Sequence, residues 1–216
     1  MDAKFDDFLD KYPVLRKEPS QFGAEEIVTK NDGPEKFEYK LFTACKPLIF
    51  NGELYPILST RWLDEIEETF VLCECPKNLK VLYANHQLKS RGLEWWKLMM
   101  TLHGSEKARN FPWEVFRKMF MDKFAPEAEM EHLRLEFMSI EHGKRSVAEY
   151  TAEFNDKSKF CPEYTSDPNR LKRHYIRNLN PEIKDFIDPK VYDALNDIIN
   201  RALEREQELK YREVSK

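Results

Sequence analysis

The apolar residues of this chain recur at the spacing of α-helices, and this pattern constrains the fold more than any other feature. A clear example is the set Trp113, Phe116, Phe120 and Phe124, whose members are separated by three or four residues. A similar stripe lies between residues 62 and 70. No segment alternates for long between apolar and polar residues, as a half-buried strand would. The sequence therefore predicts an all-α fold.

Prolines and capping residues divide this pattern into separate helices. Ala125-Pro126 interrupts it near the middle, because the residue before a proline is pushed out of the helical region. Ser146 and Glu149 have the S-x-x-E spacing of a capping box, and Gly143 before them is predicted to end the preceding helix. An Asp or Asn precedes a proline at residues 167, 180 and 188, which predicts three further helix starts. These signals predict about nine helices, in two sets on either side of Ala125-Pro126.

Two other segments carry expectations about packing. Residues 93–102 have apolar side chains around most of the helix circumference, which predicts a largely buried helix. Residues 1–46 are the least patterned part of the chain and contain the turn sequence Asn31-Asp32-Gly33-Pro34. We expect residues 1–46 to form an N-terminal arm or linker that is partly ordered.

The sequence argues against an enzyme. It contains only 6 glycines and lacks the glycine-rich loops that hold phosphates in nucleotide-binding folds. Glu129 and His132 form a single E-x-x-H, whereas a di-metal helical bundle needs two such pairs. Cys73 and Cys75 are one residue apart, which is not the C-x-x-C spacing of a zinc knuckle. We therefore expect no catalytic residues, no metal, no cofactor and no small-molecule substrate.

The chain also lacks the sequence signals of membrane targeting. Its first residues are acidic and contain no apolar core of the kind a signal peptide has. No apolar run approaches the ~20 residues that a transmembrane helix needs. We expect a soluble, cytoplasmic protein that does not contact a membrane.

Two groups of side chains allow more than one interpretation. A basic cluster could contact phosphates, or its charges could simply be solvated on the outer face of a helix; it comprises Arg170, Lys172, Arg173 and Arg177. The four tryptophans could stack on bases, but their helical spacing among Leu and Met favours a core position. In the adjacent pair Trp95-Trp96, one ring must point differently from the other and could line a groove or a subunit contact.

Several short motifs follow one another in a specific order across residues 43–205. In the first half they are Thr43-Ala44-Cys45-Lys46-Pro47, Phe50-Asn51-Gly52, Trp62-Leu63, Trp95-Trp96 and Trp113-Glu114-Val115-Phe116. In the second half they are His142-Gly143, Ser146-Val147-Ala148-Glu149-Tyr150, Phe160-Cys161-Pro162 and Tyr175-Ile176-Arg177-Asn178-Leu179. This ordered set resembles the Gag capsid domain of gypsy-type (metavirus) long-terminal-repeat retrotransposons, with plant copies the most similar.

The resemblance implies a two-lobed retrotransposon or retroviral capsid-like helical bundle. Residues 47–125 would form the N-terminal lobe and residues 126–212 the C-terminal lobe. Residues 142–154 resemble the major homology region of retroviral capsids, which braces the C-terminal lobe and supports assembly. The residues expected to carry this role are His142, Gly143, Ser146, Val147, Glu149, Tyr150 and Phe154. The expected core or groove residues of the N-terminal lobe are Trp62, Trp95, Trp96, Trp113 and Phe116.

The function implied by the resemblance is that of a capsid protein that assembles with copies of itself into a particle enclosing element RNA. The net charge is -4 and the zinc knuckle that follows many Gag domains is absent. We therefore expect this chain to bind RNA weakly, through Arg170, Lys172, Arg173 and Arg177, or by way of a separate nucleocapsid segment. The alternative is a domesticated, Gag-derived helical adaptor that binds a host peptide or protein.

Overall fold

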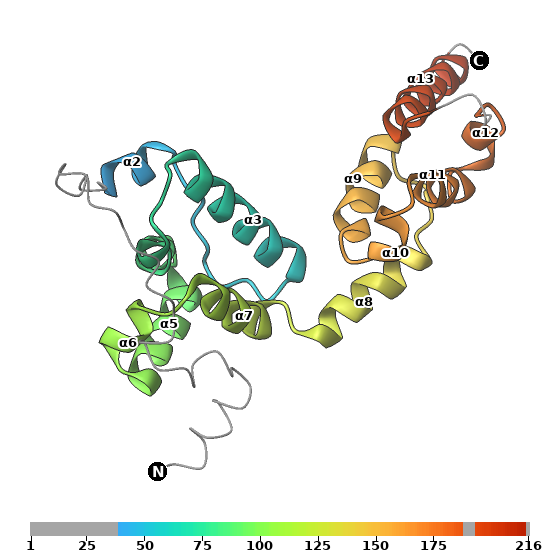
Figure 1. Ribbon diagram of the computed structural model, residues 1–216. Coiled ribbons are helices and arrows are strands. Elements are labelled where there is room, and N and C mark those ends of the chain that lie inside the picture. Colours follow the sequence, from blue (N-terminus) through green and yellow to red (C-terminus); the bar gives the residue numbers. More distant parts are fainter. Residues whose placement is uncertain (1–38, 188–192, 215–216) are drawn as a thin grey trace. The chain divides into compact units, whose positions relative to one another are not determined.

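The computed structural model describes residues 39–187 and 193–214, and helices are its main elements (Figure 1). The first half contains α2 (Tyr39–Ala44), α3 (Pro56–Leu72), the 3₁₀ turn η3 (Lys77–Leu79), α4 (Lys80–His86), α5 (Ser90–His103), α6 (Ser105–Arg109) and α7 (Trp113–Phe124). The second half contains α8 (Glu127–Met138), α9 (Val147–Ser158), α10 (Pro162–Thr165), α11 (Pro168–Arg177), α12 (Pro181–Lys184) and α13 (Leu195–Val214). The described residues form no strand, only an isolated parallel bridge between Phe50 and Leu88. The fold is all-α, as the periodicity predicts.

Local capping signals place several helix boundaries correctly. The Asp167 carboxylate accepts hydrogen bonds from two backbone amides at the start of α11, and the Asn180 side chain accepts one at the start of α12. The predicted start at Asp188-Pro189 lies outside the described residues. Helices α6 and α10 were not predicted, because segments of four or five residues are too short to show a helical period.

The chain divides into two compact units between Ala125 and Pro126. Helix α7 ends at Phe124 and α8 begins at Glu127, so the two residues between them join the units. Each unit has its own cluster of buried apolar side chains. The two units are therefore described separately, as the first unit and the second unit.

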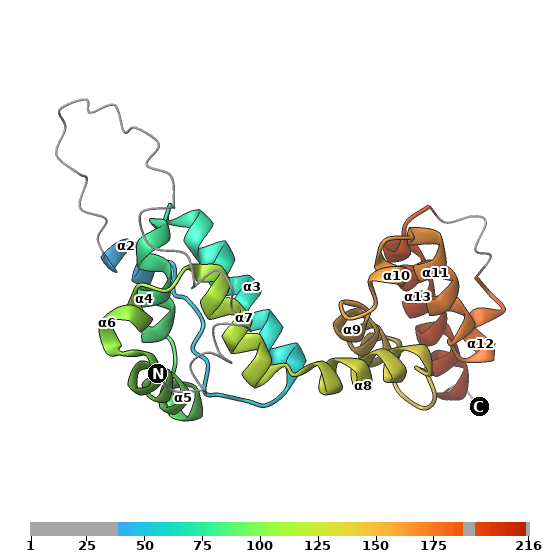
Figure 2. The same ribbon diagram turned by 60° about the horizontal axis from the view of Figure 1, so that its bottom comes forward.

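The core of the first unit is mainly aromatic. Helices α3 and α7 pack against each other, as the two views in Figures 1 and 2 show, and the Trp62 ring stacks on Phe120 with centroids 4.8 Å apart. The ring centroid of Phe50 lies 4.9 Å from those of both Phe120 and Phe124. The Ser59 hydroxyl near the start of α3 donates to the carbonyl of Phe124 at 3.0 Å. This bond ties the first turn of α3 to the last turn of α7.

The first unit begins earlier in the chain than the resemblance suggests. Phe42 on α2 is fully buried, and its ring lies 5.4 Å from Tyr83 and 5.9 Å from Phe70. Residues 39–46, which we expected to belong to an arm spanning residues 1–46, thus contribute to the core. The physical reason is the apolar area of one aromatic ring, whose burial stabilises a short helix that is marginal alone. The rest of the expected arm, residues 1–38, lies outside the described residues.

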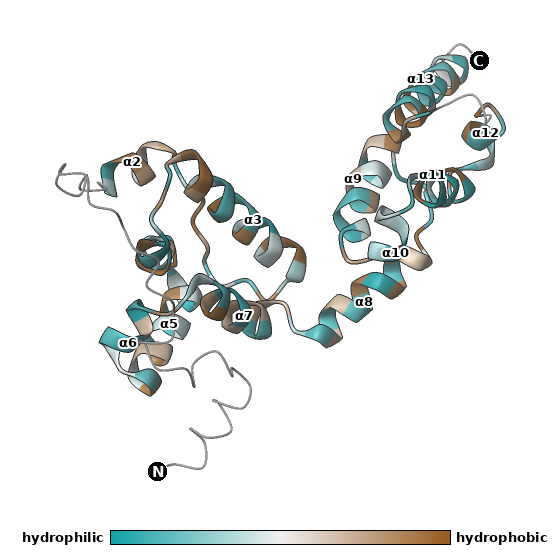
Figure 3. Cartoon of the chain, viewed as in Figure 1, coloured by the Kyte–Doolittle hydropathy of each residue, from teal (hydrophilic) through white to brown (hydrophobic). Residues whose placement is uncertain are grey.

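Helix α5 is less buried than its sequence predicts. Only Gly92, Trp95 and Trp96 are buried on it, whereas the side chains of Leu98 and Leu102 are 53% and 60% exposed. Figure 3 shows hydrophobic and hydrophilic residues together on this helix. The expectation of a largely buried helix is wrong because α5 packs through one face. Leu93, Met99 and Met100 are partly buried against the core, so Leu98 and Leu102 are its exposed apolar residues.

The core of the second unit is built from α8, α9, α11 and α13. Phe154 of α9 contacts Phe137 of α8 with ring centroids 4.9 Å apart, and it meets Tyr175 of α11 edge-on at 5.0 Å. Ile198 and Ala202 of α13 are fully buried in the same cluster. The apolar faces of four helices thus close around a small set of aromatic rings.

Two histidines are buried in the second unit, and both are held in the neutral form. The ring of His174 bonds the carbonyl of Phe137 through Nε2 at 2.8 Å, so Nε2 carries the proton because a carbonyl only accepts. The backbone amide of Asn180 donates to His142 Nδ1 at 3.2 Å, so Nδ1 is unprotonated. Burial is the main cause that lowers the pKa of both rings, and neighbouring arginines lower it further. Glu206 near His142 and the Phe137 carbonyl bonded to His174 oppose this lowering without reversing it.

We predict that the second unit loses stability as the pH falls below neutrality. A histidine whose folded-state pKa is depressed binds fewer protons in the folded state than in the unfolded state. The stability it contributes is therefore fully present above the unfolded-state pKa of about 6.5 and declines as the pH falls below that pKa. Each histidine contributes a slope of at most about 1.4 kcal/mol per pH unit. Melting of the full chain at pH 7.5 and 5.5 measures this effect. In His174→Gln, which does not titrate, the pH dependence is expected to be smaller; an unchanged slope would contradict the assignment.

We also expect each unit to fold alone. Fragments 39–125 and 126–214 should both give helical circular dichroism and cooperative melting, because each has its own apolar cluster. A fragment that starts at residue 47 lacks Phe42 and should be markedly less stable, because loss of a buried aromatic typically costs ~3–5 kcal/mol. If fragments 39–125 and 47–125 melt at the same temperature, α2 does not belong to the core.

Candidate functional site

The loop between α8 and α9 forms a corner that is fixed by backbone hydrogen bonds to a distant segment. The amide of His142 donates to the carbonyl of Asn178 at 2.8 Å, and the His142 ring accepts from the amide of Asn180. These bonds attach the corner to the link between α11 and α12. We define the corner by the residues of the expected homology region, 142–154.

Gly143 takes a positive φ of 58° in this loop. The expectation that it ends the preceding helix is wrong, because α8 ends at Met138 and Ser139 caps it. Gly143 instead makes the turn that leads into α9. A Cβ added there would meet no atom within 4 Å, so a larger residue would be disfavoured by backbone conformation rather than by a clash.

Helix α9 begins with a complete capping box. The Ser146 hydroxyl accepts a hydrogen bond from the Glu149 amide at 3.2 Å, and the Glu149 carboxylate accepts from the Ser146 amide at 2.8 Å. The Ser146 amide and hydroxyl, which both donate to this carboxylate, lower the pKa of Glu149. The predicted motif therefore stands at its predicted position, with both reciprocal bonds formed.

The start of α9 is also held by α13. The Val147 amide donates to the Glu206 carboxylate at 2.8 Å, and Glu206 forms an ion pair with Lys210 at 2.9 Å. Burial alone would raise the pKa of Glu206, but the bonds from Lys210 and from the Val147 amide lower it overall. The i,i+4 spacing of Glu206 and Lys210 is visible in the sequence. The bond from Val147 is not, because it joins residues far apart along the chain.

The two aromatic residues of the corner are fully buried in the second unit. The Tyr150 hydroxyl donates to the carbonyl of Tyr175 at 2.9 Å, which leaves no buried polar atom of that side chain unpaired. The Tyr175 hydroxyl lies 2.7 Å from Thr151 Oγ1. Burial raises the pKa of Tyr175 to about 12. Tyr150 and Phe154 thus anchor α9 to α11 and α8.

Ion pairs between α9, α8 and the loop before α9 form a second group, most of which the sequence does not reveal. Lys157 is buried and pairs with Glu153 on its own helix and with Glu136 of α8, the latter at 2.8 Å. Arg145 in the loop also pairs with Glu153. Only the Lys157–Glu153 spacing of i,i+4 is visible in the sequence. The remaining partners depend on how the loop and α8 pack against α9.

The tryptophans of the first unit are buried, with different surroundings. The Trp62 Nε1–H donates to the carbonyl of Leu48 at 2.9 Å, and that of Trp113 donates to the Glu67 carboxylate at 2.8 Å. Trp96 is almost fully buried, with Phe116 at 5.3 Å. Trp95 lines a surface groove of about 480 Å³, together with Gly52, Leu54, Arg91, Glu94, Leu98, Met99, Lys123 and Phe124.

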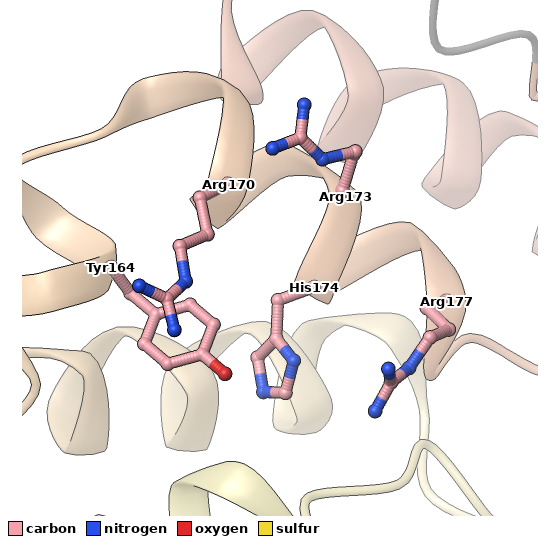
Figure 4. Close-up of a pocket in the computed structure, with 5 residues that line it drawn as sticks. All are labelled: Tyr164, Arg170, Arg173, His174 and Arg177. Atoms are coloured by element: carbon pink, nitrogen blue, oxygen red, sulfur yellow. The ribbon is translucent and has the colours of Figure 1, made fainter.

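The basic cluster of α11 separates into two parts. Arg170, Arg173 and Arg177 line one pocket of about 300 Å³ with Tyr164 and His174, which Figure 4 shows in close-up. Lys172 is not part of this pocket, and its ammonium group donates to the carbonyl of Asp193 at 2.9 Å. We refer to the hollow lined by the three arginines as the arginine pocket.

Other kinds of site are not seen in the part of the chain that the structure describes. Across residues 39–187 and 193–214, no group of three or more His, Cys, Asp or Glu side chains is placed to hold a metal ion. Within the same residues, no helix is both long and apolar enough to cross a membrane. Burial raises the pKa of the Cys75 thiol to about 12 and that of Cys161 to about 11, so neither is a nucleophile near neutral pH.

Comparison with known proteins identifies the family. The family described as Ty3 transposon capsid-like protein matches residues 39–215, which is most of the chain. No curated protein matches the sequence. Among solved structures, one described as a dARC1 capsid domain dimer is similar over 77% of this chain and 98% of its own, with 12% identity and a TM-score of 0.34. The chain is a non-enzymatic, Gag capsid-like protein, and it belongs to the Ty3 transposon capsid-like family.

Proposed function

We propose that this protein assembles with copies of itself into a closed particle that encloses retrotransposon RNA. The observation that carries the proposal is the capsid family match across residues 39–215. The two compact units fit this role as the N-terminal and C-terminal lobes of a capsid protein. In a closed symmetric shell each copy makes the same contacts, so individually weak interfaces are sufficient.

Exposed apolar side chains on both units support self-association. On α5 of the first unit these are Leu98 and Leu102, and on α8 of the second unit they are Leu135 and Met138, all more than half exposed. Exposed apolar side chains that cluster on one face often mark interaction surfaces. Two such faces on separate units would give each copy one contact through each lobe, which is what a continuous lattice requires.

The corner supports the proposal as the brace of the C-terminal lobe. It joins α9 to α8, α11 and α13 through the buried Tyr150 and Phe154 and through the bond from Val147 to Glu206. A lobe whose helices are held so firmly presents its outer faces in one fixed geometry. A repeated lattice contact needs such a geometry, because small errors at each contact add up around a closed shell.

A second candidate function is supported by the groove beside Trp95. Its apolar members Leu54, Leu98 and Met99 are flanked by the charged residues Arg91, Glu94 and Lys123. An apolar groove with charged edges fits an extended peptide or an amphipathic helix. On this alternative the protein is a Gag-derived adaptor that stays monomeric and binds a host partner. Particle formation by the purified protein separates the two functions.

We predict that the double variant Leu98→Glu, Leu102→Glu abolishes particle formation while leaving the fold intact. Both side chains are mostly exposed, so the substitutions remove apolar contact area and add like charges at the proposed interface without opening the core. Light scattering and negative-stain microscopy at rising concentration measure assembly, and thermal melting checks the fold. Lys144→Ala, at an exposed position in the second unit, is the control. A variant that assembles like the wild type would contradict the use of this face.

We predict a graded loss of stability at the corner. Phe154→Ala and Tyr150→Ala should each cost ~3–5 kcal/mol, because they leave cavities in the core. Gly143→Val should cost roughly 1 kcal/mol or more from the positive φ, and Ser146→Ala about 1 kcal/mol from the lost cap.

Tyr150→Phe separates packing from hydrogen bonding at the same position. It keeps the ring but leaves the Tyr175 carbonyl without its donor, at a cost of ~1–3 kcal/mol. Thermal melts rank the variants, and light scattering shows whether the two alanine variants lose assembly as expected. If Phe154→Ala melts and assembles like the wild type, the corner does not brace the lobe.

A further inference from the structure

Three arginines lie along one face of α11 and surround a single hollow. Arg170, Arg173 and Arg177 follow the i, i+3, i+7 spacing of one helix face, and they line the arginine pocket with Tyr164 and His174. With a rise of 1.5 Å per residue, the three positions span about 10 Å along the helix. Figure 4 shows Arg170 and Arg177 on either side of His174, whereas the guanidinium of Arg173 points away from His174. We call these three positively charged positions on one helix face the row.

No carboxylate within residues 39–187 and 193–214 pairs with any of these three arginines. Elsewhere in the second unit Arg134, Arg145, Arg201 and Arg205 each form an ion pair with a glutamate. The chain has 39 acidic residues for 35 basic ones, so neutralising partners are abundant. Charges of one sign left unpaired around one hollow produce a local field that attracts anions, although the whole chain is acidic.

The floor of the arginine pocket is rigid and uncharged. The Arg170 guanidinium lies 4.2 Å from the centre of the Tyr164 ring, and it donates to the carbonyl of Glu163 at 3.2 Å. Tyr164 in turn packs against His174 and Phe137. His174 is fixed by its bond to Phe137 and is neutral at physiological pH, so it adds no charge of its own. At least one guanidinium is thus held in place before any ligand arrives.

We propose that the arginine pocket binds closely spaced phosphate groups, carried either by an RNA strand or by a free polyphosphate. A guanidinium group binds phosphate oxygens through two parallel N–H donors. Three neighbouring guanidinium groups therefore suit a ligand with several phosphates better than a ligand with a single carboxylate. The volume of about 300 Å³ is small for an organic ligand, but the pocket is open to solvent and admits phosphates from outside. The proposal that the pocket binds phosphates does not depend on the proposed function. Only the identification of RNA as the natural source of those phosphates rests on it.

The test compares two variants of equal charge change in the full chain. In Arg170→Gln, Arg173→Gln, Arg177→Gln the row is removed. In the matched control Lys97→Gln, Arg109→Gln, Lys144→Gln, three exposed basic residues outside the pocket are replaced. Fluorescence anisotropy with a labelled oligouridylate measures RNA binding, and calorimetry with inorganic tripolyphosphate measures the free anion. Circular dichroism and melting show whether each variant is folded.

The variant with all three arginines replaced by glutamine should bind oligouridylate, tripolyphosphate or both roughly tenfold or more weakly than the wild type. The control variant should bind both probes about as tightly as the wild type does. For RNA, the slope of log affinity against log salt should fall by about 2, since each phosphate contact on a single strand contributes ~0.7. The variant with all three arginines replaced by lysine keeps the charge, so it should keep the salt slope and lose part of the affinity.

The two probes distinguish the source of the phosphates. If oligouridylate binds tightly and only a large excess of tripolyphosphate displaces it, RNA is the source of the phosphates. If tripolyphosphate binds more tightly than oligouridylate, the source is a small polyphosphate. Equal losses in the glutamine variant and its control, or no binding of either probe by the wild type, would overturn the proposal. Particle formation without nucleic acid is measured in parallel, so failure of the pocket and failure of self-assembly are separate results.

Discussion

The structure depends on the burial of aromatic rings at helix contacts, and it does so in two places that are independent of each other. In the first unit Trp62 stacks on Phe120, and in the second Phe154 packs between Phe137 and Tyr175. Each large ring removes much apolar surface from water and limits how the helices can pack. Each unit therefore closes around its own rings.

The polar contacts of the second unit refine a geometry that the rings establish. The corner is tied to α11 by Tyr150 and His142 and to α13 by Glu206, and these bonds lie in or beside the apolar cluster. Hydrogen bonds contribute modest net free energy but are costly to leave unmade when buried. They therefore select one arrangement of α9 rather than drive its burial. In the self-assembly that we propose, such a single arrangement would keep repeated contacts between copies alike.

Charge in this chain is arranged for two different tasks. Several charged groups in the second unit are paired between neighbouring helices, as in the contact of Lys157 with Glu136 and Glu153. The three arginines of the arginine pocket instead line one hollow, and no carboxylate in the described part of the chain forms an ion pair with them. On our proposal, this local group of positive charges binds a polyanion although the chain as a whole is acidic.

The sequence by itself determined what depends on neighbours along the chain. The helical class, the break at Ala125-Pro126, the capping box at Ser146 and the start of α11 all follow from residues within one or two turns of each other. The order of motifs also indicated the family. Only the tertiary structure decided which apolar residues are covered: Phe42 is buried although its segment has little pattern, and Leu98 is exposed on a helix expected to be buried. It likewise separated Lys172 from the three arginines and paired His142 with Asn178. Burial and long-range pairing depend on how distant helix faces meet, and no local spacing encodes that.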